Sequence, residues 1–159
     1  MKSIPHVISW NLTKACNLLC THCYLLADNV QPTDQSDANL PDTAHSQDTP
    51  NFNQVQCGSA SADDELDTDK ALKVIDEIAE LNPNLILILT GGEPLLRKDI
   101  FELSRHAAEK GMMVLLGTNA CLIDDEMAKK LKDNGFSGIG ISLDSVHPEI
   151  HDSIRGAKG

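Results

Sequence analysis

The sequence predicts an α/β fold in which parallel strands alternate with helices. Two observations support this prediction. Short, continuous apolar runs of strand length recur along the chain, and segments whose apolar residues follow a helical period separate them. Continuous apolar strands between amphipathic helices are typical of a parallel sheet with right-handed crossovers. Because ligands of such sheets lie at the carboxyl ends of the strands, we expect the functional residues directly after each strand.

Each element has its own signal in the sequence. Asp67 or Thr68 can cap the first helix, and Gly111 and Gly135 end the next two helices. The strands are recognised by apolar runs and the helices by apolar residues three and four apart. The expected strands lie at 6–12, 85–90, 112–117 and 138–143, and the expected helices at 71–81, 99–110 and 124–134, with a short helical stretch after the last strand.

Charge and cysteine content restrict the class of protein. The net charge is −11, but residues 28–69 contain ten acidic and no basic residues, and the rest of the chain has fourteen acids and thirteen bases. Without clustered positive charge, neither nucleic acid nor a membrane is an expected partner. The longest aliphatic run, at 85–89, is too short to span a bilayer, and the amino end lacks a signal-peptide core, so a cytoplasmic location is expected. Five cysteines, three of them within eight residues, then favour a metal site over disulfides.

Residues 29–64 differ from the rest of the chain in composition. They are rich in Asp, Gln, Ser, Asn, Thr, Ala and Pro and have no periodic apolar face. Such a segment cannot bury enough surface to offset its loss of conformational entropy on folding. We therefore expect one domain over residues 1–159, interrupted by a disordered acidic insertion at 29–64.

Cys16, Cys20 and Cys23 form the most informative motif. In one regular helix, Cys16 and Cys23 would lie about 10 Å apart along the axis, so a shared cluster requires the segment to curl as a loop. Three thiolates can bind three irons of a four-iron, four-sulfur cubane and leave the fourth iron open, whereas structural zinc normally has four protein ligands. His22 could complete a zinc set, but it adjoins Cys23 in the sequence, so tetrahedral geometry is difficult. Zinc is therefore the less favoured alternative.

The spacing Cys-x-x-x-Cys-x-x-Cys, followed by the aromatic Tyr24, resembles the signature of the radical S-adenosylmethionine (SAM) superfamily. The resemblance implies a partial (β/α) barrel, of which this chain would contain about four strand–helix units, a core domain incomplete at its carboxyl end. It also implies a 4Fe-4S cluster held by Cys16, Cys20 and Cys23. SAM would chelate the open iron, and its reductive cleavage would yield a 5′-deoxyadenosyl radical that abstracts hydrogen from the substrate.

Further motifs follow the later strands. Gly91, Gly92, Glu93 and Pro94 could form a simple turn, but paired glycines also let backbone carbonyls approach a ligand. In the family that the chain resembles, this segment binds the amino group of SAM. Polar residues after the third and fourth strands could cap helices or close turns. The resemblance implies cofactor contacts for these residues as well: Ser142 and Asp144 near the carboxylate or ribose of SAM, Arg155 at its carboxylate, and Asn119 as a weaker candidate. Tyr24, directly after the last cysteine of the motif, is expected to contact the cofactors too.

Several segments look most like enzymes of tetrapyrrole modification in d-type haem or alternative haem biosynthesis. The same branch contains maturases of ribosomal peptides and quinone cofactors. The expected partners are therefore a tetrapyrrole or peptide substrate and an electron donor such as flavodoxin or ferredoxin. A non-catalytic metal-binding module is the alternative of another class. The segments that carry the resemblance are 8–13, 89–97, 142–145, 151–152 and 155–156.

Overall fold

The computed structural model describes residues 6–25 and 65–158 of the chain. Its strands form one four-stranded sheet in the order β1-β2-β3-β4, and every neighbouring pair is parallel. The predicted α/β fold with a parallel sheet is confirmed. The predicted boundaries differ from the observed ones by one or two residues, except that the first helix begins three residues earlier than predicted. The insertion expected at 29–64 lies outside the described residues. The strands are β1 (Val7–Thr13), β2 (Ile86–Gly91), β3 (Met113–Thr118) and β4 (Phe136–Ile141).

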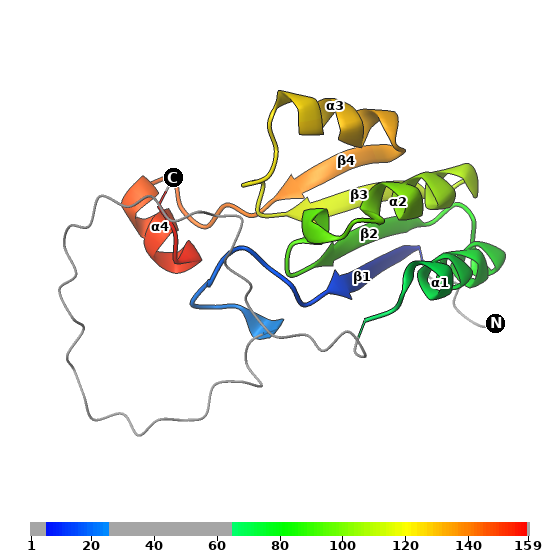
Figure 1. Ribbon diagram of the computed structural model, residues 1–159, viewed down its shortest axis with the longest axis horizontal. Helices are drawn as coiled ribbons and strands as arrows, with labels where there is room; N and C mark the ends of the chain where they lie inside the picture. Colours follow the sequence, from blue (N-terminus) through cyan, green and yellow to red (C-terminus); the bar gives the residue numbers. More distant parts are fainter. Residues whose placement is uncertain (1–5, 26–64, 159) are drawn as a thin grey trace, which may run out of the picture.

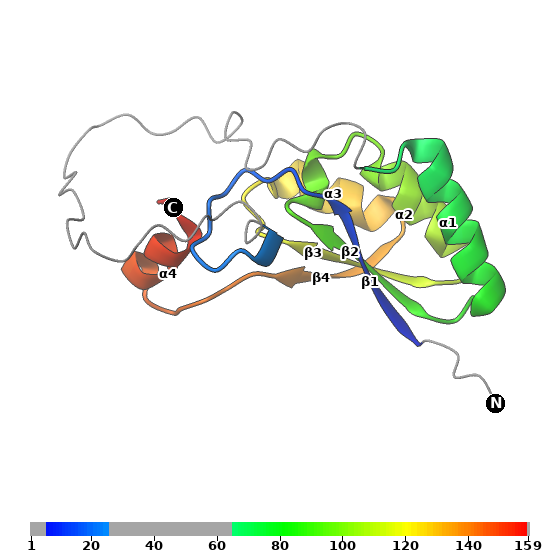
Figure 2. The same ribbon diagram turned by 90° about the horizontal axis from the view of Figure 1, so that it is seen from below.

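Three helices cover one face of the sheet, and a fourth lies beyond its carboxyl edge (Figures 1 and 2). The Asp67 side chain caps the first of them by accepting from the Lys70 amide, as the sequence predicted. Within residues 6–25 and 65–158, no helix combines the length and the apolar character needed to cross a membrane. The helices are α1 (Thr68–Leu81), α2 (Ile100–Glu109), α3 (Asp125–Asp133) and α4 (Pro148–Arg155), with a 3₁₀ turn η2 at Pro94–Leu96.

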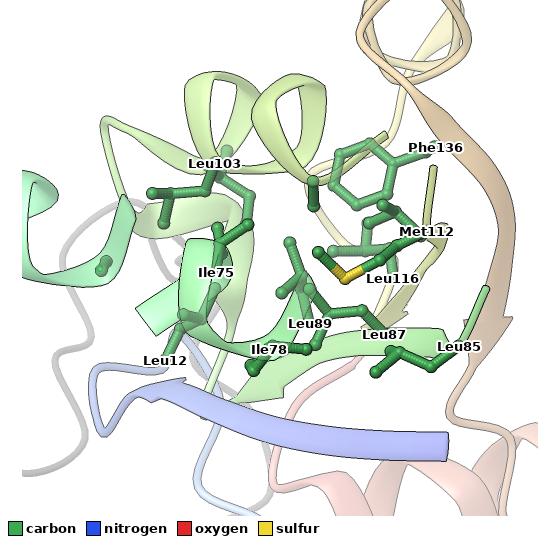
Figure 3. Close-up of a cluster of buried hydrophobic side chains, with 14 of the residues drawn as sticks. Leu12, Ile75, Ile78, Leu85, Leu87, Leu89, Leu103, Met112, Leu116 and Phe136 are labelled. Carbon is green, nitrogen blue, oxygen red and sulfur yellow. The ribbon is translucent and has the colours of Figure 1, made fainter. Parts of the chain in front are cut away.

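The hydrophobic core lies between the sheet and the three covering helices (Figure 3). Leu87 and Leu89 of β2 are fully buried on that side, while the alternating Ile86 and Ile88 are only partly buried. One face of the sheet is thus packed against helices and the other is more open among the described residues. The remaining core residues come chiefly from α1, α2 and β3: Ala71, Ile75, Ile78, Ile100, Leu103, Ala107, Val114 and Leu116.

The parallel direction of the strands brings all their carboxyl ends to one edge of the sheet. The loop of residues 14–25, which we call the cysteine loop, lies beside this edge together with α4 (Figures 1 and 2). This is the place at which parallel sheets bind their ligands.

Candidate active site

A cavity of about 300 Å³ lies at the carboxyl edge of the sheet, within the range of about 300–1,000 Å³ usual for small-molecule sites. The cysteine loop forms one wall, and the carboxyl ends of β2, β3 and β4 form the rest together with Arg155 of α4. Nine of the twelve residues predicted to bind the cluster or SAM line it: Cys16, Cys20, Cys23, Tyr24, Gly91, Gly92, Asn119, Ser142 and Arg155. The fold therefore gathers residues that are up to 139 positions apart in the sequence.

Gly91 and Gly92 join the end of β2 to the cysteine loop. The Gly92 amide donates to the Thr13 carbonyl, and the Glu93 amide donates to the Ala15 carbonyl, both at 2.8 Å. A Cβ at Gly92 would lie 2.3 Å from the Ala15 oxygen, and one at Gly91 would lie 2.4 Å from the Thr13 oxygen. The two glycines are thus required by the close approach of the cysteine loop, in addition to any contact with a ligand.

Glu93 and Pro94 lie behind the cavity wall and are not among its lining residues. Glu93 is 0% exposed, and its carboxylate accepts from the Leu95 amide at 3.1 Å, the Thr118 hydroxyl at 3.0 Å and the Asn119 amide at 2.9 Å. Burial raises the pKa of Glu93, and these hydrogen bonds oppose the rise. The side chain therefore ties the end of β2 to the end of β3 rather than facing the cavity.

Asn17 is a site residue that the sequence analysis missed. Asn119 Nδ2 donates to Asn17 Oδ1 at 2.7 Å and lies 3.9 Å from Cys16 Sγ. Asn17 is 3% exposed, and its Nδ2 has no hydrogen-bond partner among the described residues. A buried donor left unpaired costs about 1–3 kcal/mol, so a further acceptor is expected beside Cys16. In the sequence, the only signal of a role for Asn17 in the site is its position directly after Cys16.

The chemistry of the site fits an iron–sulfur cluster. Three thiols line one cavity, and the orphaned Asn17 amide next to Cys16 can donate to a sulfur atom. In the described part of the chain, no three Cys, His, Asp or Glu side chains are placed to hold a single metal ion. A cubane does not need thiols that converge on one point, because each thiolate binds a different iron.

Arg155 and Asp144 face each other beside the cysteine loop. Arg155 Nη1 lies 3.7 Å from Cys20 Sγ. On the other side of the guanidinium, Arg155 Nε lies 2.7 Å from Asp144 Oδ2. These two atoms form an ion pair, but they are not aligned as a hydrogen bond. The second carboxylate oxygen of Asp144 is 3.3 Å from His22 Nε2. Asp144 does not line the cavity, and it pairs with Arg155 through the Nε side of the guanidinium. Tyr24 is largely exposed, and its hydroxyl donates to Asn11 at 3.1 Å.

Arg97 is a second residue that the sequence analysis did not assign to the site. Its largely buried guanidinium donates to the Leu12 carbonyl at 3.0 Å, the Leu66 carbonyl at 3.1 Å and Asp99 at 2.6 Å. Burial acts to raise the pKa of Asp99, but the hydrogen bonds from Arg97 and Thr68 outweigh it and lower that pKa. Arg97 therefore anchors the end of β1, from which the cysteine loop starts.

A loop with three cysteines follows the first strand of a parallel sheet and faces a glycine-lined cavity, so the chain is an α/β protein with a candidate cofactor site at the carboxyl edge of its sheet. The family is established by comparison, because the model of the radical SAM superfamily matches residues 10–159. The chain belongs to this superfamily, and the resemblance predicted from its motifs is confirmed.

Known proteins place the chain more closely within the superfamily. It is 38% identical over 153 residues to the Fe-coproporphyrin III synthase of Methanosarcina barkeri, an alignment covering 96% of this chain and 30% of that protein. It is 34% identical over 159 residues to the AdoMet-dependent heme synthase of the same organism, covering 100% of this chain and 37% of that protein. The chain thus spans about a third of the length of these curated relatives.

A solved structure shows the same fold at low sequence identity. The crystal structure of BtrN in complex with AdoMet and 2-DOIA superimposes with a TM-score of 0.61 and 14% identity, covering 89% of this chain and 46% of that chain. At this identity the likeness concerns the fold alone.

Proposed function

We propose that this chain forms part of a radical SAM enzyme of haem biosynthesis, in which Cys16, Cys20 and Cys23 hold a 4Fe-4S cluster and SAM binds beside it. One observation carries the proposal: the three cysteines and the Gly91–Gly92 segment, about 70 positions apart in the sequence, line the same cavity. When bound, the cluster and SAM supply one-electron cleavage of SAM and a 5′-deoxyadenosyl radical for hydrogen abstraction.

The residues of this chain bind and orient these groups. Cys16, Cys20 and Cys23 would each ligate one iron of the cluster, which would leave the fourth iron open to SAM. The Gly91 and Gly92 backbone, already at the cavity wall, offers carbonyl groups to the SAM ammonium. Other lining residues complete the proposed SAM site.

Arg155 is suited to the carboxylate of SAM. Arg155 lines the cavity, and its guanidinium is always charged and carries N–H donors besides the Nε that pairs with Asp144. Ser142 lies on the same wall and contributes a hydroxyl. We assign supporting contacts to Tyr24 and Asn119, whereas Asp144, Glu93 and Pro94 hold the walls in place.

The relatives suggest the substrate class. Fe-coproporphyrin III synthase and AdoMet-dependent heme synthase, by their names, make iron tetrapyrroles, so we propose a tetrapyrrole substrate and a role in the cytoplasm. Flavodoxin or ferredoxin is the proposed electron donor. Peptide maturation is the alternative that the motifs leave open, and a substrate assay separates the two.

The first experiment is anaerobic reconstitution of the full chain with iron and sulfide, followed by reduction and electron paramagnetic resonance with and without SAM. A 4Fe-4S signal perturbed by SAM is expected for the wild-type chain. Cys20→Ala should lose the signal. Cys121→Ala is the matched control, because Cys121 is an exposed thiol that does not line the cavity.

Three results would overturn the proposal: no cluster assembled by the wild-type chain, zinc bound in place of an iron cluster, or a cluster that Cys20→Ala leaves intact. The substrate class is tested separately by incubating the loaded chain with SAM, reductant and either iron coproporphyrin or a peptide. Formation of 5′-deoxyadenosine stimulated by the tetrapyrrole supports the haem assignment, and stimulation only by the peptide contradicts it.

A further inference from the structure

We propose that the carboxyl end of α4 clamps the middle of the cysteine loop, with Arg155 as a positioning residue for Cys20 and Gly156 as the point of closest approach. The inference deepens the proposed function and rests on it in one respect, since it treats Cys20 as a cluster ligand. Three independent contacts between the α4 end and the loop support it.

The first contact is between backbones. The Thr21 amide donates to the Ile154 carbonyl at 2.9 Å, and the Thr21 hydroxyl donates to the same oxygen at 3.4 Å. The last four carbonyls of a helix have no partner within it, so α4 offers one of them to the loop. No residue of α4 is buried, which leaves contacts of this kind to hold the helix in place.

The second contact depends on a glycine. Gly156 caps α4 in the left-handed conformation, with φ of 69°. A Cβ on this residue would lie 2.6 Å from the Leu19 carbonyl oxygen. Both the backbone conformation and the space at this position therefore favour glycine, and any larger residue would push the helix end away from the loop.

The third contact brings positive charge to a proposed cluster ligand. Arg155 Nη1 lies 3.7 Å from Cys20 Sγ, and Asp144 holds the other side of the same guanidinium. The side chains of Arg155 and Asp144 are only 14% and 20% exposed, so solvent screens this arrangement weakly. A cationic donor at a thiolate stabilises that ligand, and hydrogen bonds to cluster sulfurs make reduction easier.

The experiment begins with the chain free of metal, so that the clamp is tested apart from the cluster. Hydrogen exchange is measured at the cysteine loop in wild type, Gly156→Ala and Gly140→Ala. Gly140 is the matched control, because the nearest atom to a Cβ there is 3.8 Å away. Faster exchange at Thr21 in Gly156→Ala alone supports the clamp. Equal exchange in all three chains overturns it, and protection of the core strand β2 shows that each variant is folded.

The second part uses the reconstituted chain without SAM, so that binding of SAM by Arg155 has no effect on the result. Arg155→Gln should show a more negative midpoint potential and roughly tenfold faster loss of iron to a chelator, in line with loss of a charge-assisted hydrogen bond. Lys158→Gln, which removes a nearby exposed charge, should match wild type. If Arg155→Gln also matches wild type, Arg155 does not position Cys20. Failure of the wild-type chain to assemble any cluster refutes the proposed function, while the exchange experiment still decides whether α4 holds the loop.

Discussion

Replacing Gly92 by alanine should loosen the join between β2 and the cysteine loop. The added Cβ would lie 2.3 Å from the backbone oxygen of Ala15, so no side-chain rotation can relieve the overlap. The chain must move apart at this point. That movement stretches the hydrogen bonds from Gly92 to Thr13 and from Glu93 to Ala15, both 2.8 Å long.

The size of the effect follows from these contacts. Overpacking costs about 1–3 kcal/mol, and each of the two backbone hydrogen bonds contributes about 0.5–1.5 kcal/mol. We expect Gly92→Ala to lower the free energy of unfolding by about 2–6 kcal/mol, a large share of the roughly 5–15 kcal/mol of a typical domain. The iron content after reconstitution should fall in parallel, because the loop that carries the cysteines is displaced.

Urea unfolding followed by tryptophan fluorescence measures this change. Trp10 is the single tryptophan and packs against the core from β1, next to the cysteine loop. Gly140→Ala, at an open position of β4, should change the free energy of unfolding by less than about 0.5 kcal/mol. If Gly92→Ala is no less stable than Gly140→Ala, the glycine is not required by the loop and the reasoning is refuted.

Three further predictions concern buried residues. Burial raises the pKa of Glu93 above its ordinary value of 4.5, so the folded chain keeps the carboxyl proton to higher pH than the unfolded chain does. The contribution of Glu93 to the free energy of unfolding therefore falls as pH rises from about 4.5 through the folded pKa. Glu93→Gln should flatten that slope in urea unfolding across this range, and an unchanged slope would contradict the assignment. Asn17→Leu removes an unpaired buried donor together with one hydrogen bond, so the free energy of unfolding of the metal-free chain should change by less than about 1 kcal/mol. The chain loaded with the cluster should release iron faster than wild type. Equal rates of iron release would exclude a hydrogen bond from Asn17 to the cluster. Leu89→Ala should lower the free energy of unfolding, measured with heat or urea, by about 2–5 kcal/mol. Val7→Ala, at a residue that is 53% exposed, should have little effect. Similar losses of stability in both variants would argue against this core.

The fold was predictable because its signals are local. The caps Asp67 and Asp124 and the apolar runs of the strands act within a few residues, and the structure places each helix and strand within three residues of its predicted bounds. Among the strands, the fourth shows the largest shift, from 138–143 to Phe136–Ile141. Its glycines at 138 and 140 weaken the apolar pattern that marks a strand.

The candidate site was predictable in part. The cysteine motif and the paired glycines each follow a strand of one parallel sheet, so the sequence indicated that these two segments lie together at the carboxyl edge of the sheet. The sequence could not show that Glu93 turns inward to Thr118 and Asn119, or that Arg97 reaches back 85 positions to Leu12. Such contacts depend on how distant segments pack, and no local pattern encodes them.

The overlap at Gly91 and Gly92 also bears on how such motifs are interpreted in evolution. The atoms that exclude a side chain there are backbone oxygens of Thr13 and Ala15, which are present whatever residues occupy those positions. No compensating substitution in the loop can therefore make room. A descendant that had lost its chemistry but kept this chain path would still need both glycines, whereas its cysteines would be free to drift. Retained glycines are thus no evidence of retained catalysis by themselves, whereas retained cysteines are.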